Sequence, residues 1–244
     1  MIKRLIVTVY LVFFVIAFGI SQSFFFGIKG GPSIGYQKWE NFNQKPVLTY
    51  HIASFIESYS EENPMNTLYA QLGYHNRGSA LRGALGYTID GNVFRLPTRN
   101  FLFHNISLGL GAKRKQQLKE DLKSFYSFGL RAEYTISTNL DKFAHFNQRQ
   151  SYPYYPDNIF VKKFVYGAQV GGGVEYVFSE LVELLIELSI NPDLSNQYLQ
   201  PEIGSIVDPY HPNNTITLRK RRIKNVTVEI SFGFRFMRKV EYVD

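Results

Sequence analysis

Two short motifs of this 244-residue chain place a histidine three residues before a serine, the residue types that acyl-transfer enzymes use as base and nucleophile. They are His51 with Ser54 and His104 with Ser107. Both lie in segments with strand periodicity, where an odd offset sends two side chains to opposite faces. Neither pair can act as a local dyad, although pairing between strands stays open. The chain also has no cysteine and no metal-ligand spacing, so we predict neither an enzyme nor a metal or cofactor site.

A second set of residues is charged and falls at the polar positions of alternating segments. These residues form either a polar relay or narrow gated pore, or an ion-pair network that fills a narrow barrel. Buried charges need partners, so five glutamates against two arginines require further cations, bound water or protonated carboxylates. The predicted interior polar network comprises Arg131, Glu133, Glu175, Glu183, Glu187, Glu229 and Arg235.

A third set is basic and lies where long connections return to predicted strands. Arginine forks suit phosphate oxygens, so these residues are candidate contacts to lipopolysaccharide phosphates, or else ordinary solvated loop ends. The predicted phosphate contacts are Lys162, Lys163, Arg219, Lys220, Arg221 and Arg222, and Lys224 belongs to the same basic run. The net charge of +7 is spread over strand ends and loops, and the predicted export described below disfavours a nucleic-acid partner.

Two long connections, residues 138–163 and 191–223, are rich in proline or aromatic residues. The first holds Phe143, Phe146, Tyr152, Tyr154, Tyr155 and Phe160, with Pro153 and Pro156. Such loops suit the binding of a protein partner or glycan, and they equally suit a self-packed lid over a barrel mouth.

The elements that must position these residues are strands, because period two dominates after residue 23. Between Lys224 and Met237, for example, apolar residues from Val226 to Phe236 alternate with polar ones such as Glu229 and Arg235. Eight segments are predicted strands: Phe24–Gln37, Val47–Ser58, Thr67–Asn76, Phe101–Arg114, Phe125–Ser137, Val165–Phe178, Val182–Ile190 and Lys224–Met237.

A membrane barrel explains these strands better than a soluble sandwich does. Most of them run for 10–14 residues, aromatic residues gather at the ends of the apolar faces, and the polar faces carry charges of both signs. Mean hydropathy is −0.16, which excludes a polytopic helical membrane protein. The sequence therefore predicts an all-β, eight-stranded antiparallel transmembrane β-barrel with up-and-down topology.

Connection lengths give an independent indication. One side of the predicted barrel receives the short connections 59–66, 115–123 and 179–181, and the last of these would place Phe178 opposite Val182. The other side receives 38–46, 77–100, 138–163 and 191–223. Short periplasmic turns and long surface loops are typical of outer-membrane barrels. The prediction is an outer-membrane protein with both termini in the periplasm.

The first 21 residues have the layout of a signal peptide. Lys3 and Arg4 precede an uncharged stretch from Leu5 to Ile20, and Gly19 and Ser21 suit a cut after residue 21. An uncleaved N-terminal anchor is the alternative. We predict a leader at 1–21 and one barrel domain at 22–244.

Four blocks of sequence resemble the PorT-like outer-membrane β-barrel family of Bacteroidota. They are Gly27–Gly31, Leu68–Gly78, Tyr166–Glu175 and Asn225–Phe236, with a partial counterpart of a further family stretch at Phe94–Pro97. The chain departs from the usual pattern in continuing over Met237–Asp244 beyond the last aromatic residue. The resemblance implies the barrel fold and a connection with type IX secretion.

Together these features predict a non-enzymatic outer-membrane barrel that acts as a surface anchor, scaffold or binding protein, either alone or within an envelope or type IX secretion-related complex. A narrow channel for ions or small solutes, and a lipid-modifying enzyme, are the two alternatives. The predicted partners are outer-membrane lipid, lipopolysaccharide, and a protein bound through loops 138–163 and 191–223.

Overall fold

The computed structural model describes residues 23–39, 44–83, 85–87, 92–149, 155–179, 181–208, 211 and 213–239. The predicted leader at 1–21 lies outside the described residues. Eight long strands account for most of the rest. They are β1 (Phe24–Trp39), β2 (Val47–Ser58), β3 (Asn66–Leu81), β6 (Arg99–Lys119), β7 (Leu122–Thr138), β8 (Phe164–Ser179), β9 (Val182–Pro192) and β13 (Arg221–Arg238).

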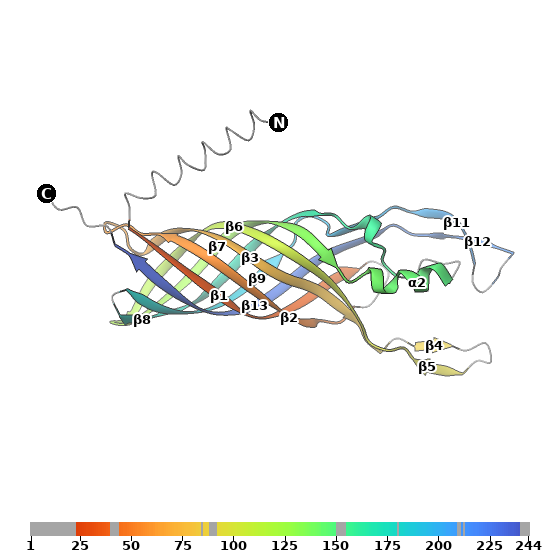
Figure 1. Cartoon of the computed structure of the whole chain (residues 1–244), viewed down its shortest axis with the longest axis horizontal. Coiled ribbons are helices and arrows are strands. Elements are labelled where there is room, and N and C mark those ends of the chain that lie inside the picture. The colour runs from red at the N-terminus through yellow and green to blue at the C-terminus, as the bar shows by residue number, and fades with distance from the viewer. Residues whose placement is uncertain are drawn as a thin grey trace, which may run out of the picture.

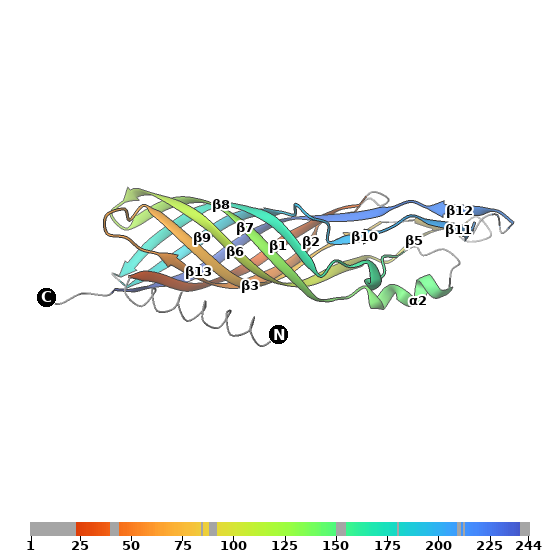
Figure 2. The same ribbon diagram turned by 90° about the horizontal axis from the view of Figure 1, so that it is seen from above.

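These strands form a closed ring. Each is antiparallel to the next in the order β1-β2-β3-β6-β7-β8-β9-β13. The ring closes through β1 and β13, which pair from Phe24↔Arg238 to Trp39↔Ile223. Figures 1 and 2 show the strands running obliquely around the long axis. The predicted eight-stranded up-and-down barrel is confirmed, and all eight predicted segments form its strands.

The barrel is apolar outside and polar inside. On β7, Tyr126, Phe128 and Leu130 are exposed on the outer wall, whereas Arg131 and Glu133 are buried inside. The other wall strands repeat this alternation over most of their length. An apolar exterior around a polar interior is stable in lipid, because the exposed apolar side chains contact the lipid chains. The closed ring of strands also provides hydrogen-bond partners for the backbone N–H and C=O groups.

The height of the apolar wall fits a membrane. Tyr166 and Tyr176 lie ten residues apart on β8, and both rings are exposed. At about 3.3 Å per residue and a tilt of about 40°, this spacing spans about 25 Å, the height of the apolar band of transmembrane barrels. Tyr36, Tyr50 and Tyr134 are exposed at the same end as Tyr166 and form an aromatic girdle with it. The chain folds as a transmembrane β-barrel.

Connections differ in length between the two ends, as predicted for all but one of them. The end that holds Phe24 and Arg238 carries the turns 59–65, 120–121 and 180–181. The other end carries the three long connections 82–98, 139–163 and 193–220, together with 40–46, which has the same length as 59–65. One detail of the sequence prediction was wrong. Val182 pairs with Ser179 rather than with Phe178, because the register shifts between Val177 and Ser179. This irregularity shortens the turn to two residues and leaves Phe178 exposed.

The long connections contain structure that the sequence did not predict. They hold the short ribbons β4 (Leu85–Tyr87) with β5 (Val93–Arg95) and β11 (Ile203–Val207) with β12 (Thr215–Leu218), the helix α2 (Asp141–Arg149) and a 3-10 turn, η1 (Asn158–Phe160). Figure 1 shows both ribbons projecting beyond the barrel. The strand β10 (Tyr198–Gln200) instead pairs with β13 beyond the end of β9 and so lengthens the wall.

Two glycines allow close backbone approaches near the loop end, Gly35 between β1 and β3 and Gly78 between β3 and β6. A Cβ atom on Gly35 would lie 2.7 Å from the carbonyl oxygen of Gly78, and one on Gly78 would lie 2.1 Å from that of Phe101. The atoms that these Cβ atoms would meet belong to the backbone, which cannot move aside as the end of a flexible side chain can. Both positions therefore require glycine.

Candidate functional site

The buried charged side chains of the barrel face the lumen. Near the short turns, three carboxylates and three cations form one group. Lys115 Nζ lies 3.2 Å from both Glu57 and Glu175, and Arg235 lies 2.8 Å from Glu57 and 2.9 Å from Glu175. Lys113 also pairs with Glu57 and Glu175, and Arg235 Nε donates to Glu183 at 2.7 Å. Formal charge in this group, the turn-end cluster, is balanced.

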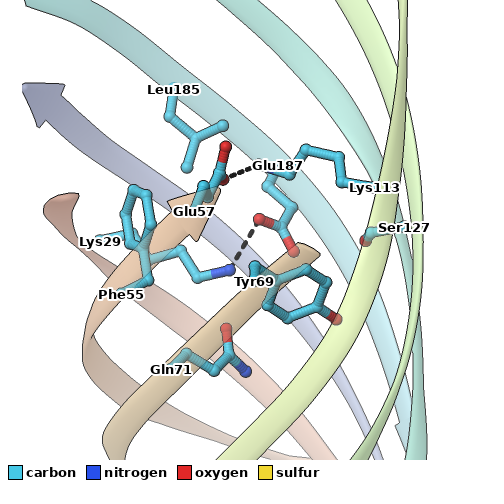
Figure 3. A pocket seen from close by; sticks show the side chains of 9 residues that line it. All are labelled: Lys29, Phe55, Glu57, Tyr69, Gln71, Lys113, Ser127, Leu185 and Glu187. Carbon is cyan, nitrogen blue, oxygen red and sulfur yellow. Dashed lines mark hydrogen bonds and ion pairs between the residues drawn. The ribbon is translucent and has the colours of Figure 1, made fainter. Parts of the chain in front are cut away.

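Further along the strands, Lys29 donates to Glu187 at 2.7 Å across the lumen (Figure 3). Gln71 reaches over in the same region and donates to Gln169 at 2.7 Å. A cavity of about 10 Å³ lies among Lys29, Tyr69, Gln71 and Glu187. That space is room for about one water molecule and far too little for a hydrated ion.

A second ionic group, the loop-side cluster, continues the column. Arg77 donates to both oxygens of Glu133, at 2.6 and 2.9 Å, and Arg131 contacts Glu133 and Asp193, each at 2.5 Å. His75 Nδ1 lies 2.8 Å from Glu229. Every one of these side chains is buried. Bidentate arginine–carboxylate pairs are rigid, so they hold the strands in register and leave little freedom for opening.

His51 stacks on His75, with ring centroids 5.6 Å apart, and its two nitrogens lie 2.9 and 2.8 Å from the hydroxyls of Ser33 and Ser231. The prediction that each His-x-x-Ser pair is split between faces is confirmed. His51 and Ser107 are buried inside, whereas Ser54 and His104 lie on the outer side of the wall. The serines near His51 thus come from other strands. His51 is buried, with 3% of its surface exposed.

The mouth at the loop end is filled by a hydrophobic group, the mouth cluster. Trp39, Leu81, Phe101, Phe103, Leu140, Tyr155, Tyr198 and Ile223 are buried together, and Phe143, Phe146, Phe160 and Val161 pack against them. Arg99 clamps the helix α2 onto this cluster, because its guanidinium lies 3.9 Å from the ring centroid of Phe146 and 4.5 Å from that of Tyr155. The described part of loop 138–163 is therefore a self-packed lid. Tyr152, Pro153 and Tyr154 lie outside the described residues.

All seven residues of the predicted interior network face the lumen and are buried. The cations that balance the predicted excess of glutamate are Lys29, Arg77, Lys113 and Lys115, and the sequence analysis missed them together with Glu57, His75 and Asp193. The alternation of the strand could have identified one of these cations from the sequence. Lys113 follows Gly109 and Gly111 at every second position, so it lies on the same inward face as they do.

The predicted phosphate contacts need one correction. Arg221 is only 1% exposed and lies inside the barrel near Trp39, so it cannot reach a lipid phosphate from the wall. Strand parity explains this, because Arg221 is an odd-numbered residue on a strand whose even-numbered residues face outward. Lys162, Lys163, Arg219, Lys220 and Arg222 are exposed.

Within the described ranges, no helix is long and apolar enough to cross a membrane, and no three His, Asp or Glu side chains are grouped so as to hold a metal ion. No family model matches the sequence, and no curated protein matches it.

Several solved structures are similar in outline. Neisserial surface protein A aligns with 12% identity and a TM-score of 0.45, over 87% of this chain and 96% of that one. The outer membrane protein OprG from Pseudomonas aeruginosa aligns with 10% identity and a TM-score of 0.48, over 88% and 97%. The outer membrane protease OmpT from Escherichia coli aligns with 10% identity and a TM-score of 0.43, over 89% and 97%. The fold assignment itself rests on the closed ring of eight strands.

Proposed function

We propose that this chain is a sealed outer-membrane barrel that anchors and displays a binding surface at the cell exterior, without catalysing a reaction. The observation that carries the proposal is the filling of the lumen. The turn-end cluster, the Lys29–Glu187 pair, the loop-side cluster and the mouth cluster follow one another along the barrel. A narrow barrel filled by paired side chains is a rigid support rather than a conduit.

The outer membrane is the proposed location because transmembrane barrels with short turns at one end and long loops at the other are typical of it. We further propose export through the leader at 1–21 and termini on the periplasmic side. Cell fractionation should recover the chain with the outer membrane, and N-terminal sequencing of the mature protein should start at Gln22. Recovery in the soluble periplasmic fraction would overturn the location.

The proposed partner surface is smaller than the two predicted loops. Loop 138–163 is largely committed to the mouth cluster, whereas loop 191–223 sends out the β11–β12 ribbon, on which Thr215, Thr217 and Val207 are exposed. We therefore propose that a protein partner binds the β11–β12 ribbon. The PorT-like resemblance makes an envelope or type IX secretion complex the proposed setting.

Matched ribbon deletions test this proposal. Replacing residues 203–218 by a short glycine–serine linker removes β11–β12 and leaves β10 in the wall. Replacing residues 85–95 removes the β4–β5 ribbon and serves as the control. After cross-linking on intact cells, a specific envelope protein should be lost with the first deletion and kept with the second. Equal recovery with both deletions would contradict binding through this ribbon.

The proposed absence of catalysis has its own test. A lipid-acting enzyme would change the acyl pattern of lipid A, so the lipid A of a deletion strain should be unchanged by mass spectrometry. An altered pattern that is restored by the wild-type gene would contradict a purely non-enzymatic role.

A further inference from the structure

Four exposed cations occupy adjacent strand positions on one side of the outer wall, at the loop end. Lys38 on β1 is opposite Lys224 on β13, and Arg222 lies two residues away on the same outer face. Leu199 on β10 is paired with Arg222. The segment that carries Lys162 joins β10 through the antiparallel bridge Val161↔Tyr198, and the Lys162 amide donates to the carbonyl of Gln197 just before β10, at 2.9 Å. Lys38, Lys162, Arg222 and Lys224 form the basic wall patch.

Lys38 and Lys224 are an unusual cross-strand pair. Like charges directly opposite each other on neighbouring strands destabilise a sheet. No carboxylate of the described part of the chain forms an ion pair with either lysine, although Lys224 Nζ donates to the carbonyl of Leu194 at 2.9 Å. An ammonium group has three donors, so both lysines keep donors for an anion that would relieve their repulsion.

The height of the patch relative to the membrane indicates which anion it binds. Tyr36 and Val226, paired two residues below Lys38 and Lys224, are exposed and belong to the upper edge of the apolar wall. Tyrosines at this level mark the membrane interface, where lipid phosphates lie. The patch therefore sits at headgroup height rather than in bulk solvent.

Apolar side chains flank the patch on one side. Ile159 is 75% exposed on η1, Phe164 is 62% exposed at the start of β8, and Leu194 is 53% exposed. Cations beside exposed apolar groups suit an amphiphile, whose phosphate meets the lysines while its chain covers the apolar surface. Free phosphate would use only the first of these features.

The width of the patch matches more than one phosphate. Neighbouring strands lie about 4.8 Å apart, so the three steps from β1 through β13 and β10 to the Lys162 segment span about 14 Å. A headgroup with two phosphates can thus contact Lys38 and Lys224 with one phosphate and Lys162 with the other.

We propose that the basic wall patch binds a bisphosphorylated glycolipid of the lipid A class from the outer leaflet. This inference rests on the proposed outer-membrane location and assigns that location a specific lipid contact. It leaves out the buried Arg221, keeps Lys224 from the predicted basic set, and adds Lys38, which that set did not contain.

Purified full-length protein in a non-ionic detergent provides the test, with bound lipid measured by native mass spectrometry. The probes are bisphosphorylated lipid A, the same lipid A without phosphates, phosphatidylglycerol and inorganic phosphate. The double variant Lys38→Gln/Lys224→Gln removes the facing pair. The control Arg114→Gln/Lys119→Gln makes the same charge change at exposed residues near the opposite end of the barrel.

We expect wild type and control to bind bisphosphorylated lipid A alike and the double variant to bind it more weakly, by about fivefold for each lysine removed. Lipid A without phosphates and inorganic phosphate should bind poorly to all three proteins. Equal binding by the double variant, equal binding of dephosphorylated lipid A, or tighter binding of phosphatidylglycerol than of lipid A would each overturn the proposal.

Thermal unfolding of the variants shows whether they are folded, and neutralising one of two facing lysines is not expected to destabilise the sheet. If the double variant does unfold, the single variant Lys38→Gln replaces it, with an expected loss of about fivefold. Failure of lipid binding by a chain that fractionates with the outer membrane would reject this site alone. Binding by a chain found in another compartment would reject the location and leave the site.

Discussion

Between the short turns and the middle of the barrel the lumen is filled by ion pairs, whereas at the loop end it is filled by aromatic and aliphatic side chains. The turn-end cluster joins six charged residues from β2, β6, β8, β9 and β13. The mouth cluster instead joins the ends of wall strands to residues of the loops. Both arrangements fill the lumen, but their stability depends on the individual side chains in different ways.

A buried ion-pair group is sensitive to the loss of any one member, because the remaining charges stay buried without compensation. An aromatic cluster loses stability in proportion to the surface and volume removed. In the ionic region, removal of any one charged side chain should therefore cost most of the stabilisation of strand register. In the mouth cluster, the loss of stability should grow with the amount of side chain removed. Variants in each region should separate these behaviours.

The largest effect is expected for Arg235→Met in the turn-end cluster. Arg235 contacts Glu57, Glu175 and Glu183, so its removal leaves these three buried carboxylates with Lys113 and Lys115 as their buried counterions. The partly exposed Lys123, 3.5 Å from Glu183, compensates only in part. The free energy of unfolding in detergent should fall by about 3–5 kcal/mol. Arg114→Met, on the exposed outer side of β6, should change it by no more than about 0.5 kcal/mol. Equal effects of the two variants on the free energy of unfolding in urea would show that the buried ion pairs of the turn-end cluster do not stabilise the barrel.

Phe103→Ala in the mouth cluster should come next. Phe103 is fully buried, and its truncation opens a cavity that costs about 3 kcal/mol. Phe103→Leu should recover more than half of that loss, because packing is graded whereas charge compensation is not. A leucine variant as unstable as the alanine variant would show that the mouth behaves like the ionic region.

Gly35→Ala tests the close approach of β1 and β3. The added methyl group would meet the backbone at Gly78, so some wall movement is required, at a cost of about 1–3 kcal/mol. Gly83→Ala is a poor control because of its positive φ, but Gly204 has open space around it. Thermal unfolding should therefore show a loss for Gly35→Ala and almost none for Gly204→Ala.

The smallest effect is expected for Arg99→Gln, which removes the clamp on α2. A cation over aromatic faces contributes about 0.5–2 kcal/mol. Because α2 lies outside the ring of strands, the loss should appear as faster cleavage within residues 141–149 by a protease, with nearly unchanged global unfolding. Unchanged cleavage would mean that aromatic packing alone holds the helix.

The same contrast explains what could be predicted from sequence. The eight strands and the inward direction of residues such as Glu175 and Arg235 follow from period two, because the lipid-facing side is apolar at nearly every second position. Arg221 was misplaced because it was treated as part of a basic run rather than by strand parity. The mouth cluster could not be predicted, because it unites Trp39, Phe101, Tyr155 and Tyr198, whose proximity depends on loop paths that have no period. The partners of the interior glutamates were likewise hidden, since pairs such as Glu57 with Arg235 join residues far apart in sequence.

A barrel whose lumen is filled along its length should not conduct ions across a membrane. Planar-bilayer recording of the purified wild-type protein measures this, with a known porin as the positive control for insertion and protease protection of the inserted chain as evidence that it is present. We predict no steady open events at any applied voltage that the bilayer tolerates. Steady, reproducible conductance from the wild-type chain would contradict the sealed barrel and support a channel.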